Sequence, residues 1–257
     1  MSTLTAVPLH GIWRVMPSPM LTEIFSRGGM QFQILDCEHG AYDYQTLLPD
    51  ILACERYGCV PLVRVSGTDK VEVQRCLDLG ARGIVFPQLA TPEDFSRSAA
   101  MMDYAPAGSR GFNPFVRAGG YGFPSADAVA RSRPWFMPIV ETLAAVEAID
   151  EIARLPRLDV VYVGVYDLSA QLGCPGRMDS PELLLAVEQV LSACRRAGKA
   201  TSLMALSPAM AQDLAARGVQ AIVHGVETHR LSQAVGDILQ PMNRLTLPAG
   251  TTPLTQP

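Results

Sequence analysis

The feature that most constrains the fold of this chain is a regular alternation of strand-like and helix-like segments. Short runs rich in β-branched residues recur along the chain, and an amphipathic segment such as 181–197 follows most of them. Strands that alternate with helices form parallel sheets, because each helix returns the chain to the same edge of the sheet. About eight such units in 257 residues predict a single-domain (β/α)8 barrel.

The alternative fold is an open, doubly wound sheet. A dinucleotide-binding sheet of that kind would carry a GxGxxG turn after its first strand, and the sequence has none there, nor a Walker A pattern. We expect strands at 11–15, 32–36, 60–65, 83–88, 136–141, from 159 to a break at Gly164, and at 200–205 and 221–225. We expect helices at 17–29, 44–57, 70–79, from an N-cap at Thr91, and at 143–154, 181–197, 208–217 and 228–239. Residues 104–134 predict a long loop with a function, such as a lid or substrate wall, the alternative being a passive insertion.

Composition limits the class of partner and the compartment. The hydrophobic fraction of 48% suits a large core, and the charged fraction of 18% favours an oligomer. A net charge of −4 gives no reason to expect nucleic acid or a membrane surface. No apolar run could span a bilayer and no signal peptide is visible, while six scattered cysteines are typical of reduced thiols in the cytoplasm. We expect the barrel domain to cover 1–247 and a disordered tail to cover 248–257.

Polar side chains recur where the predicted strands end. In a barrel the carboxyl ends of all strands converge on one mouth, where chemistry is expected. The residues at these ends are Arg14, Asp36, Glu38, His39, Arg64, Gln88, Glu141, Asp167 and His224. A single residue of this kind can be a surface or packing residue, but its recurrence on strand after strand predicts an active site.

The residue types at these ends indicate metal-assisted enolate chemistry. Glu141 and Asp167 follow neighbouring strands, and two carboxylates suit Mg²⁺ or Mn²⁺ better than zinc. The alternatives are that Asp167 caps a turn, or that the pair acts as an acid/base couple or a partner of Arg64. Arg64 could hold a carboxylate or enolate, and His39 could move a proton near neutral pH.

Several segments together resemble the HpcH/HpaI aldolase family, the class II pyruvate aldolases related to the citrate lyase β subunit. The matching segments are 35–40 (LDCEHG), 61–65 (PLVRV), 76–87 (CLDLGARGIVFP), 106–111 (PAGSRG), 140–142 (VET), 164–169 (GVYDLS) and 172–173 (LG), within residues 10–235. The resemblance implies a barrel that exchanges its last helix between subunits, and a hexamer built from dimers. It also implies reversible cleavage of a 4-hydroxy-2-oxo acid to pyruvate and an aldehyde.

The resemblance implies a role for each matching residue. Glu141 and Asp167 would bind the metal, Arg64 would hold the enolate oxygen, and His39 with Asp78 behind it would handle protons. The residues expected to contact the substrate are Glu38, Gln88, Gly164, Val165, Tyr166, Arg110 and Arg117.

The chain also departs from the family pattern. Val140 replaces a Gln before the metal-binding Glu, Val165 replaces a Pro after Gly164, and 29–31 and 225–227 lack the usual Asp. These departures raise an alternative, the siderophore-pathway branch of the family, which condenses oxaloacetate with acetyl-CoA without requiring a metal. Arg110 and Arg117 would then suit a dicarboxylate or CoA, unless they are solvated loop charges or subunit contacts. A third hypothesis, a non-catalytic descendant, does not explain convergent charges at the mouth.

Overall fold

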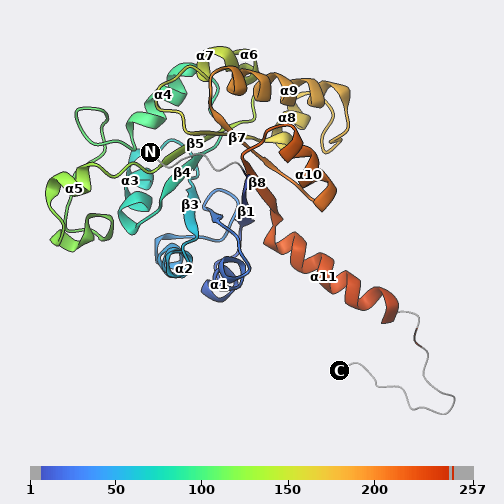
Figure 1. Ribbon diagram of the computed structural model, residues 1–257, viewed down its shortest axis with the longest axis horizontal. Helices are drawn as coiled ribbons and strands as arrows, with labels where there is room; N and C mark the ends of the chain where they lie inside the picture. The colour runs from blue at the N-terminus through green and yellow to red at the C-terminus, as the bar shows by residue number, and fades with distance from the viewer. Residues whose placement is uncertain (1–6, 243–244, 246–257) are drawn as a thin grey trace, which may run out of the picture.

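The computed structural model describes residues 7–242 and 245 and contains a closed barrel of eight parallel strands (Figure 1). Each strand pairs with its neighbour in sequence, and β1 closes the barrel on β8. The strands are β1 (Leu9–Arg14), β2 (Phe32–Asp36), β3 (Val60–Arg64), β4 (Gly83–Phe86), β5 (Trp135–Val140), β6 (Val160–Val163), β7 (Ala200–Met204) and β8 (Ala221–Val226). The predicted fold class is therefore confirmed.

Helices surround the barrel and connect its strands. They are α1 (Pro19–Arg27), α2 (Tyr44–Arg56), α3 (Lys70–Leu79), α4 (Pro92–Ala100), η1 (Arg117–Gly122), α5 (Ala126–Ala130), α6 (Leu143–Glu147), α7 (Ile149–Ile152), α8 (Val165–Gln171), α9 (Pro181–Arg196), α10 (Pro208–Ala216) and α11 (Glu227–Met242). Thr91 caps α4 as predicted, because its hydroxyl accepts from the Asp94 amide and Pro92 stands at the first helical position.

The alternation of side chains along each strand separates two cores. Every second residue points into the barrel, which is filled by Trp13, Phe32, Ile34, Leu62, Val85, Met137, Ile139, Tyr162, Met204 and Val223 among others. The intervening residues face the helices and form a larger outer core. A residue at a strand's carboxyl end therefore reaches the mouth from within only if it continues the inward series.

The structure differs from the predicted elements at three places. The stretch 104–134 is not a plain loop, since it contains the 3-10 helix η1 and the short helix α5. The predicted helix 143–154 is divided into α6 and α7 at Ala148. A short helix, α8, begins directly after Gly164, so Asp167 lies in a first helical turn.

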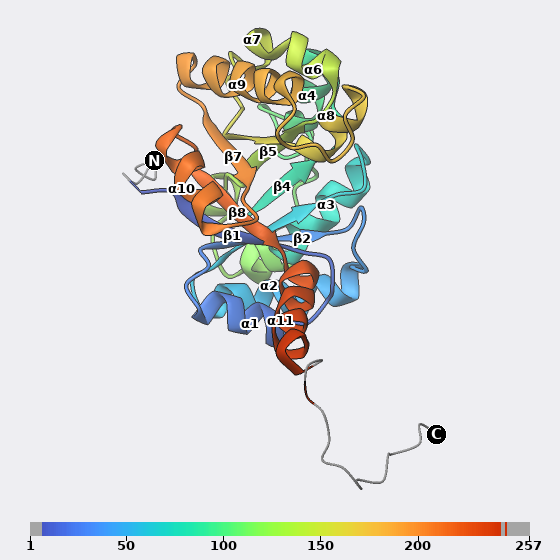
Figure 2. The same ribbon diagram turned by 90° about the vertical axis from the view of Figure 1, so that its right-hand side faces the viewer.

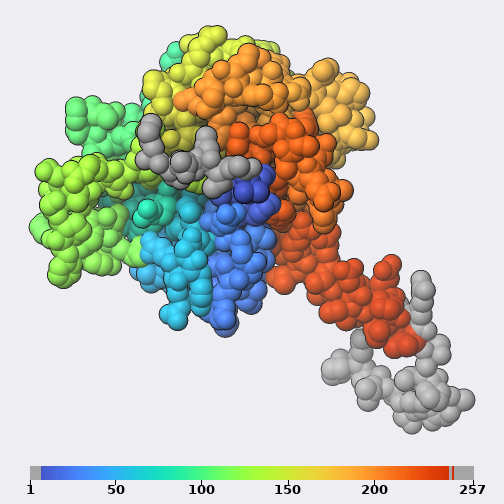
Figure 3. Space-filling view, in the orientation of Figure 1, coloured from blue at the N-terminus to red at the C-terminus, as the bar shows by residue number. Residues whose placement is uncertain are grey.

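The last helix, α11, leaves the barrel and projects away from the other elements (Figure 1), and in the turned view it is drawn in front of α2 (Figure 2). In the space-filling view it stands clear of the rounded body formed by the other elements (Figure 3). Only its first residue, Glu227, is buried. The predicted tail 248–257 lies outside the described residues, and the predicted exchange of α11 between subunits remains a prediction.

Two further expectations concern the chain as a whole. All six cysteines are free thiols, as their scattered spacing predicted. Across residues 7–242, none of the helices combines the length and apolar character needed to cross a bilayer.

Candidate active site

The centre of the mouth is an ion pair between Asp36, at the end of β2, and Arg64, at the end of β3. Arg64 Nε donates to Asp36 Oδ1 over 2.8 Å, and Arg64 Nη2 donates to the other carboxylate oxygen. Trp13 Nε1 also donates to Asp36 Oδ2 over 2.9 Å, and the Arg64 guanidinium lies 4.8 Å from the Trp13 ring centroid. Burial acts to raise the pKa of Asp36, but the hydrogen bonds and charge of Arg64 outweigh it and leave the pKa below its ordinary value. Arg64 is therefore a fixed, oriented cation.

Glu38 and Gln88 connect this ion pair to Glu141. Glu38 Oε2 lies 2.7 Å from Arg64 Nη1, and Gln88 Nε2 donates to Glu38 Oε1 over 3.0 Å. The Gln88 backbone amide donates to Glu141 Oε1 over 2.5 Å. This amide is aimed by a left-handed backbone at Gln88, with φ of 58°, which is strained for a residue with a side chain. Such strain is concentrated at functional sites.

Glu141 is a buried carboxylate that follows β5 and meets further negative charge. Burial raises its pKa to about 7; Asp167 and Glu38 raise it too, and the Gln88 amide and Arg64 oppose them. Glu141 packs directly against Gly164, where a Cβ atom would lie 2.6 Å from Glu141 Cβ and 2.9 Å from Glu141 Oε2. A glycine at this position therefore lets the Glu141 carboxylate approach the end of β6, and the nearby Arg64 only partly offsets the burial and the negative charge around it.

These features fit a hard divalent cation held by two protein carboxylates. Mg²⁺ usually takes one or two carboxylates and completes its shell with water and substrate oxygens. Glu141 follows β5 and Asp167 lies in the first turn of α8, after the neighbouring strand β6, so the two carboxylates come from adjacent strand ends. Within the described residues no cluster of three or more His, Cys, Asp or Glu side chains could form an all-protein metal cage. The residues present therefore suit Mg²⁺ or Mn²⁺ with open coordination positions.

His39 lies in the loop after β2, at the mouth and exposed to solvent. Its backbone amide donates to Asp36 Oδ1 over 3.2 Å, and the Glu38 amide donates to the same oxygen over 2.9 Å. Asp36 therefore orients both the cation at Arg64 and the backbone that carries His39. Gly40 follows, where a side chain would collide with the Asp36 and Val15 carbonyl oxygens.

The structure does not bring every predicted site residue to this mouth. Asp78 lies on α3 and pairs with Arg110 over 2.9 Å, and in residues 7–242 no hydrogen bond joins Asp78 to His39. Arg117 pairs with Glu55 and donates to the Leu79 carbonyl over 3.1 Å. Because Glu55 and Leu79 end helices that return to the amino ends of the strands, Arg117 lies at the opposite end of the barrel from the mouth.

Val165 and Tyr166 begin α8 directly after Gly164, at the carboxyl end of β6. Tyr166 is half exposed. The positions of Glu38, Gln88, Gly164, Val165 and Tyr166 therefore agree with contact to a bound substrate, whereas Arg110 and Arg117 are held by ion pairs elsewhere in the same chain.

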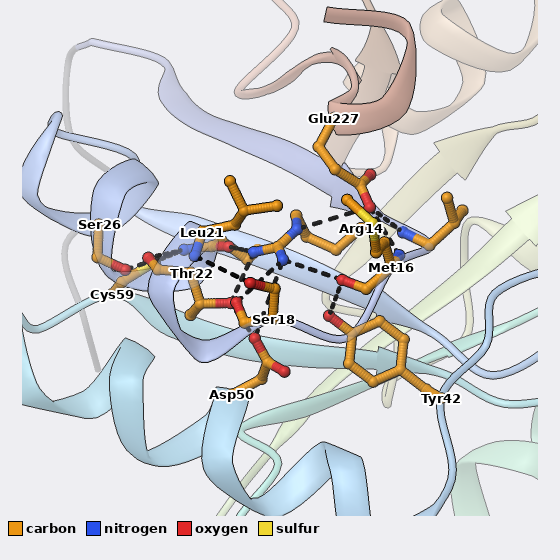
Figure 4. Close-up of polar contacts among 12 residues, drawn as sticks. Arg14, Met16, Ser18, Leu21, Thr22, Ser26, Tyr42, Asp50, Cys59 and Glu227 are labelled. Carbon is orange, nitrogen blue, oxygen red and sulfur yellow. Dashed lines mark hydrogen bonds and ion pairs between the residues drawn. The ribbon is translucent and has the colours of Figure 1, made fainter. Parts of the chain in front are cut away.

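Two strand-end residues, Arg14 and His224, face outward. Arg14 is fully buried between the barrel and α1, where Nη1 donates to Thr22 Oγ1 and Gln33 Oε1 (Figure 4). His224 lies on the outer face of β8 and pairs with His10 over 2.8 Å. Both were expected at the mouth, and this expectation was wrong, because each lies one position out of step with the inward series.

The same alternation identifies a residue that the sequence analysis missed. Trp13, one position before Arg14, points inward and contacts Asp36, Arg64 and Tyr162, whose ring centroid is 5.1 Å away. Trp13 pairs with Ile34, the inward-facing residue two positions before Asp36 on β2. This register would have identified Trp13 as an inward-facing residue near the mouth.

Comparisons with known proteins agree with this geometry. Residues 10–234 match the HpcH/HpaI aldolase/citrate lyase family. A 2-keto-3-deoxy-L-rhamnonate aldolase of Klebsiella pneumoniae is 31% identical over 227 residues, covering 88% of this chain and 85% of that protein. An HpcH/HpaI aldolase/citrate lyase family protein of Burkholderia cenocepacia superposes with a TM-score of 0.88 at 28% identity, covering 93% and 95% of the two chains. The citrate synthase SbnG superposes with a TM-score of 0.84 at 26% identity, covering 93% and 94%.

Proposed function

Because this chain belongs to the HpcH/HpaI aldolase/citrate lyase family, we propose that it is an aldolase that reversibly cleaves a 4-hydroxy-2-oxo acid into pyruvate, or a related 2-oxo acid, and an aldehyde. The observation that carries the proposal is the arrangement of Arg64 beside Glu38 and Glu141 at a barrel mouth. A fixed cation near Glu141 and Asp167, which would hold a divalent metal, is suited to a substrate whose 2-oxo oxygen becomes negative during reaction. The named aldolase relatives act on a keto acid of this class.

In this reaction the bond between C3 and C4 of the substrate breaks. His39 takes the proton of the 4-hydroxyl group as the aldehyde forms, and the electron pair of the broken bond moves into the enolate of the 2-oxo acid. Arg64 stabilises the enolate oxygen through its guanidinium, which Asp36 and Trp13 hold in place. A proton returned to C3 then gives the 2-oxo acid. The reverse direction is an aldol addition.

Glu141 and Asp167 would hold Mg²⁺ or Mn²⁺. When bound, such a cation supplies Lewis-acid polarisation of the 2-oxo group. Gly164 lets Glu141 pack directly against the end of β6, and Gln88 orients Glu141 through its backbone amide. Val165 and Tyr166 would border the bound acid.

A second candidate function is citrate synthesis from oxaloacetate and acetyl-CoA without a metal requirement. The superposition on SbnG and the replacement of Gln by Val140 favour it. Arg64 would then stabilise a different oxygen anion. The enzyme would act in a siderophore pathway.

A parallel assay separates the two functions. Pyruvate release from a panel of 4-hydroxy-2-oxo acids is measured with and without EDTA, together with thiol release from acetyl-CoA plus oxaloacetate. The aldolase predicts EDTA-sensitive pyruvate release that Mn²⁺ restores, and loss of that release in Glu141→Gln but not in the matched control Glu147→Gln. If EDTA leaves thiol release unchanged and no pyruvate is released, the aldolase proposal is refuted and citrate synthesis becomes the proposed function.

The remaining features of the proposal concern partners and location. We propose small-molecule substrates, assembly into a homo-oligomer, and a cytoplasmic location in keeping with six free thiols. The net charge of −4 gives no reason to add nucleic acid or an anionic membrane as a partner.

A further inference from the structure

Glu227, the first residue of α11, is a fully buried carboxylate attached to the loop after β1. Its Oε1 accepts from the Val15 amide over 2.8 Å and from the Met16 amide over 2.7 Å. Arg14 Nε lies 3.8 Å from the same oxygen (Figure 4). The base of the projecting helix is therefore fixed to a loop at the barrel mouth.

Arg14 holds the same loop from its other side. Its Nη2 donates to the carbonyl oxygens of Met16 and Ser18 over 3.1 and 3.3 Å. Arg14 and Glu227 are fully buried, and a hydrogen bond to a charged group is stronger than one between neutral groups. Glu227 and Arg14 thus hold the backbone at Val15 and Met16 from two sides.

That loop in turn supports the loop that carries His39. The Ala41 amide donates to the Val15 carbonyl over 2.8 Å, and the Tyr42 hydroxyl donates to the Met16 carbonyl over 3.2 Å. Gly40 packs against Val15 so closely that a side chain would not fit. The two residues that Glu227 fixes by their amides are thus the two whose carbonyls fix the His39 loop.

We propose that Glu227 is a positioning residue that sets the His39 loop through Val15 and Met16, so that seating of α11 is coupled to proton transfer at the mouth. The proposal rests on the proposed function for its catalytic consequence, whereas the coupling itself rests on the contacts alone. Within residues 7–242, Glu227 makes no hydrogen bond or ion pair with Arg64, Glu141 or Asp167, so it acts on the mouth only through the loop that carries Glu38 and His39.

The contacts predict different results for two substitutions at this position. Glu227→Gln keeps an oxygen that can accept from both amides, so the loop stays in place although the charge facing Arg14 is lost. Glu227→Ala removes the acceptor of both amides and the carboxylate charge 3.8 Å from Arg14 Nε. Glu182→Ala, an exposed first-turn residue of α9, is the matched control for removal of a carboxylate from the start of a helix.

The test is amide hydrogen exchange of the peptide covering 37–43 in the intact protein, combined with steady-state kinetics. Glu227→Ala should accelerate exchange in this peptide at least tenfold and lower kcat by about 10–100-fold with KM changed less than threefold. Glu227→Gln and Glu182→Ala should stay within threefold of wild type in both measurements. If Glu227→Gln keeps wild-type exchange and kinetics while Glu227→Ala does not, Glu227 acts by positioning the loop and not through a general loss of structure.

Tyr42→Phe provides an independent check if Glu227→Ala fails to fold. It removes one link between the two loops and should accelerate exchange of the same peptide about threefold. In the double variant the two effects should be less than multiplicative, because they break one path. If the exchange rate of peptide 37–43 in Glu227→Ala stays within twofold of wild type, the coupling is refuted. If Glu227→Ala does not fold, the same result in Tyr42→Phe refutes it. Absence of aldolase activity in the wild type would refute the proposed function and leave the exchange result to decide the coupling.

Discussion

Gly164 is a position in the site that has no room for a side chain. A methyl group there would overlap Glu141, whose Cβ would be 2.6 Å away. We predict that Gly164→Ala displaces the Glu141 carboxylate, weakens Mn²⁺ binding at least tenfold and lowers kcat/KM about 100-fold, as expected for a misplacement of about 1 Å. Titration calorimetry with Mn²⁺ and pyruvate-release kinetics measure the two effects. Gly67→Ala, where the added methyl meets no atom within 4 Å, should behave as wild type; equal losses in both variants would contradict the steric argument.

Arg64 depends on the shape of its guanidinium as well as its charge. It binds Asp36 through two nitrogens and Glu38 through a third, which a lysine ammonium cannot reproduce. We predict that Arg64→Lys lowers kcat about 10²–10³-fold, the range found when one donor to a developing oxygen anion is removed. Kinetics with far-ultraviolet circular dichroism would show an inactive, folded enzyme, and Arg82→Lys serves as an exposed control. Activity within threefold of wild type would remove Arg64 from the proposed role.

Sequence reasoning found the charged residues of the site but not their orientation. Glu38, Arg64 and Glu141 were identified because a charge after an apolar strand stands out in a sequence. Trp13 was not, because an aromatic residue in a strand is equally consistent with the core. The contacts of Asp78 with Arg110, and of Arg117 with Glu55, depend on how the 104–134 segment folds back, which no local pattern specifies.

At the scale of elements, the alternation of strands and helices was sufficient to predict the barrel. Each strand end was located to within a few residues because buried parallel strands are nearly continuous apolar runs. The short elements α5, α8 and η1 were missed because they have too few residues to show a helical period. Their position on the barrel, rather than their composition, stabilises them.

The seam between β1 and β8 gives the structure a pH dependence of its own. Burial lowers the pKa of His224 below its usual 6.5, and the neighbouring His10 and Arg230 lower it further. The unfolded chain therefore takes up a proton near pH 6.5 while the folded His224 stays neutral, so stability falls as pH falls from about 6.5 toward the folded pKa. We predict that His224→Gln reduces this loss, measured by urea unfolding at pH 7.5 and 5.5 at one protein concentration. An unchanged difference between the two pH values would contradict the assignment.

At the scale of the whole molecule, α11 does not cover the barrel from which it emerges. From residue 231 to 242 its residues are exposed, and Leu231, Val235, Ile238 and Met242 recur at helical spacing along one face. The outer face of the β1–β8 seam holds a cavity lined by Ile12, Phe25, Met30, Ser207, Pro208, His224 and Arg230. The exchange of α11 between two copies stays a prediction from the sequence resemblance, and it would give this exposed apolar face a partner.

This arrangement predicts how the assembly responds to charge on α11. In Val235→Asp/Ile238→Asp, two carboxylates on the apolar face would have to be buried in the dimer, at a cost of several kcal/mol. We expect sedimentation velocity at micromolar concentration to show dimers or larger species for the wild type and monomers for the double variant. Gln240→Asp adds a carboxylate on the opposite face of the same helix and should leave assembly unchanged. If the double variant sediments as the wild type does, α11 is not the interface. If it is monomeric but retains the Glu227 contacts and the slow exchange of 37–43, the interface lies on α11 while the loop is positioned within each chain.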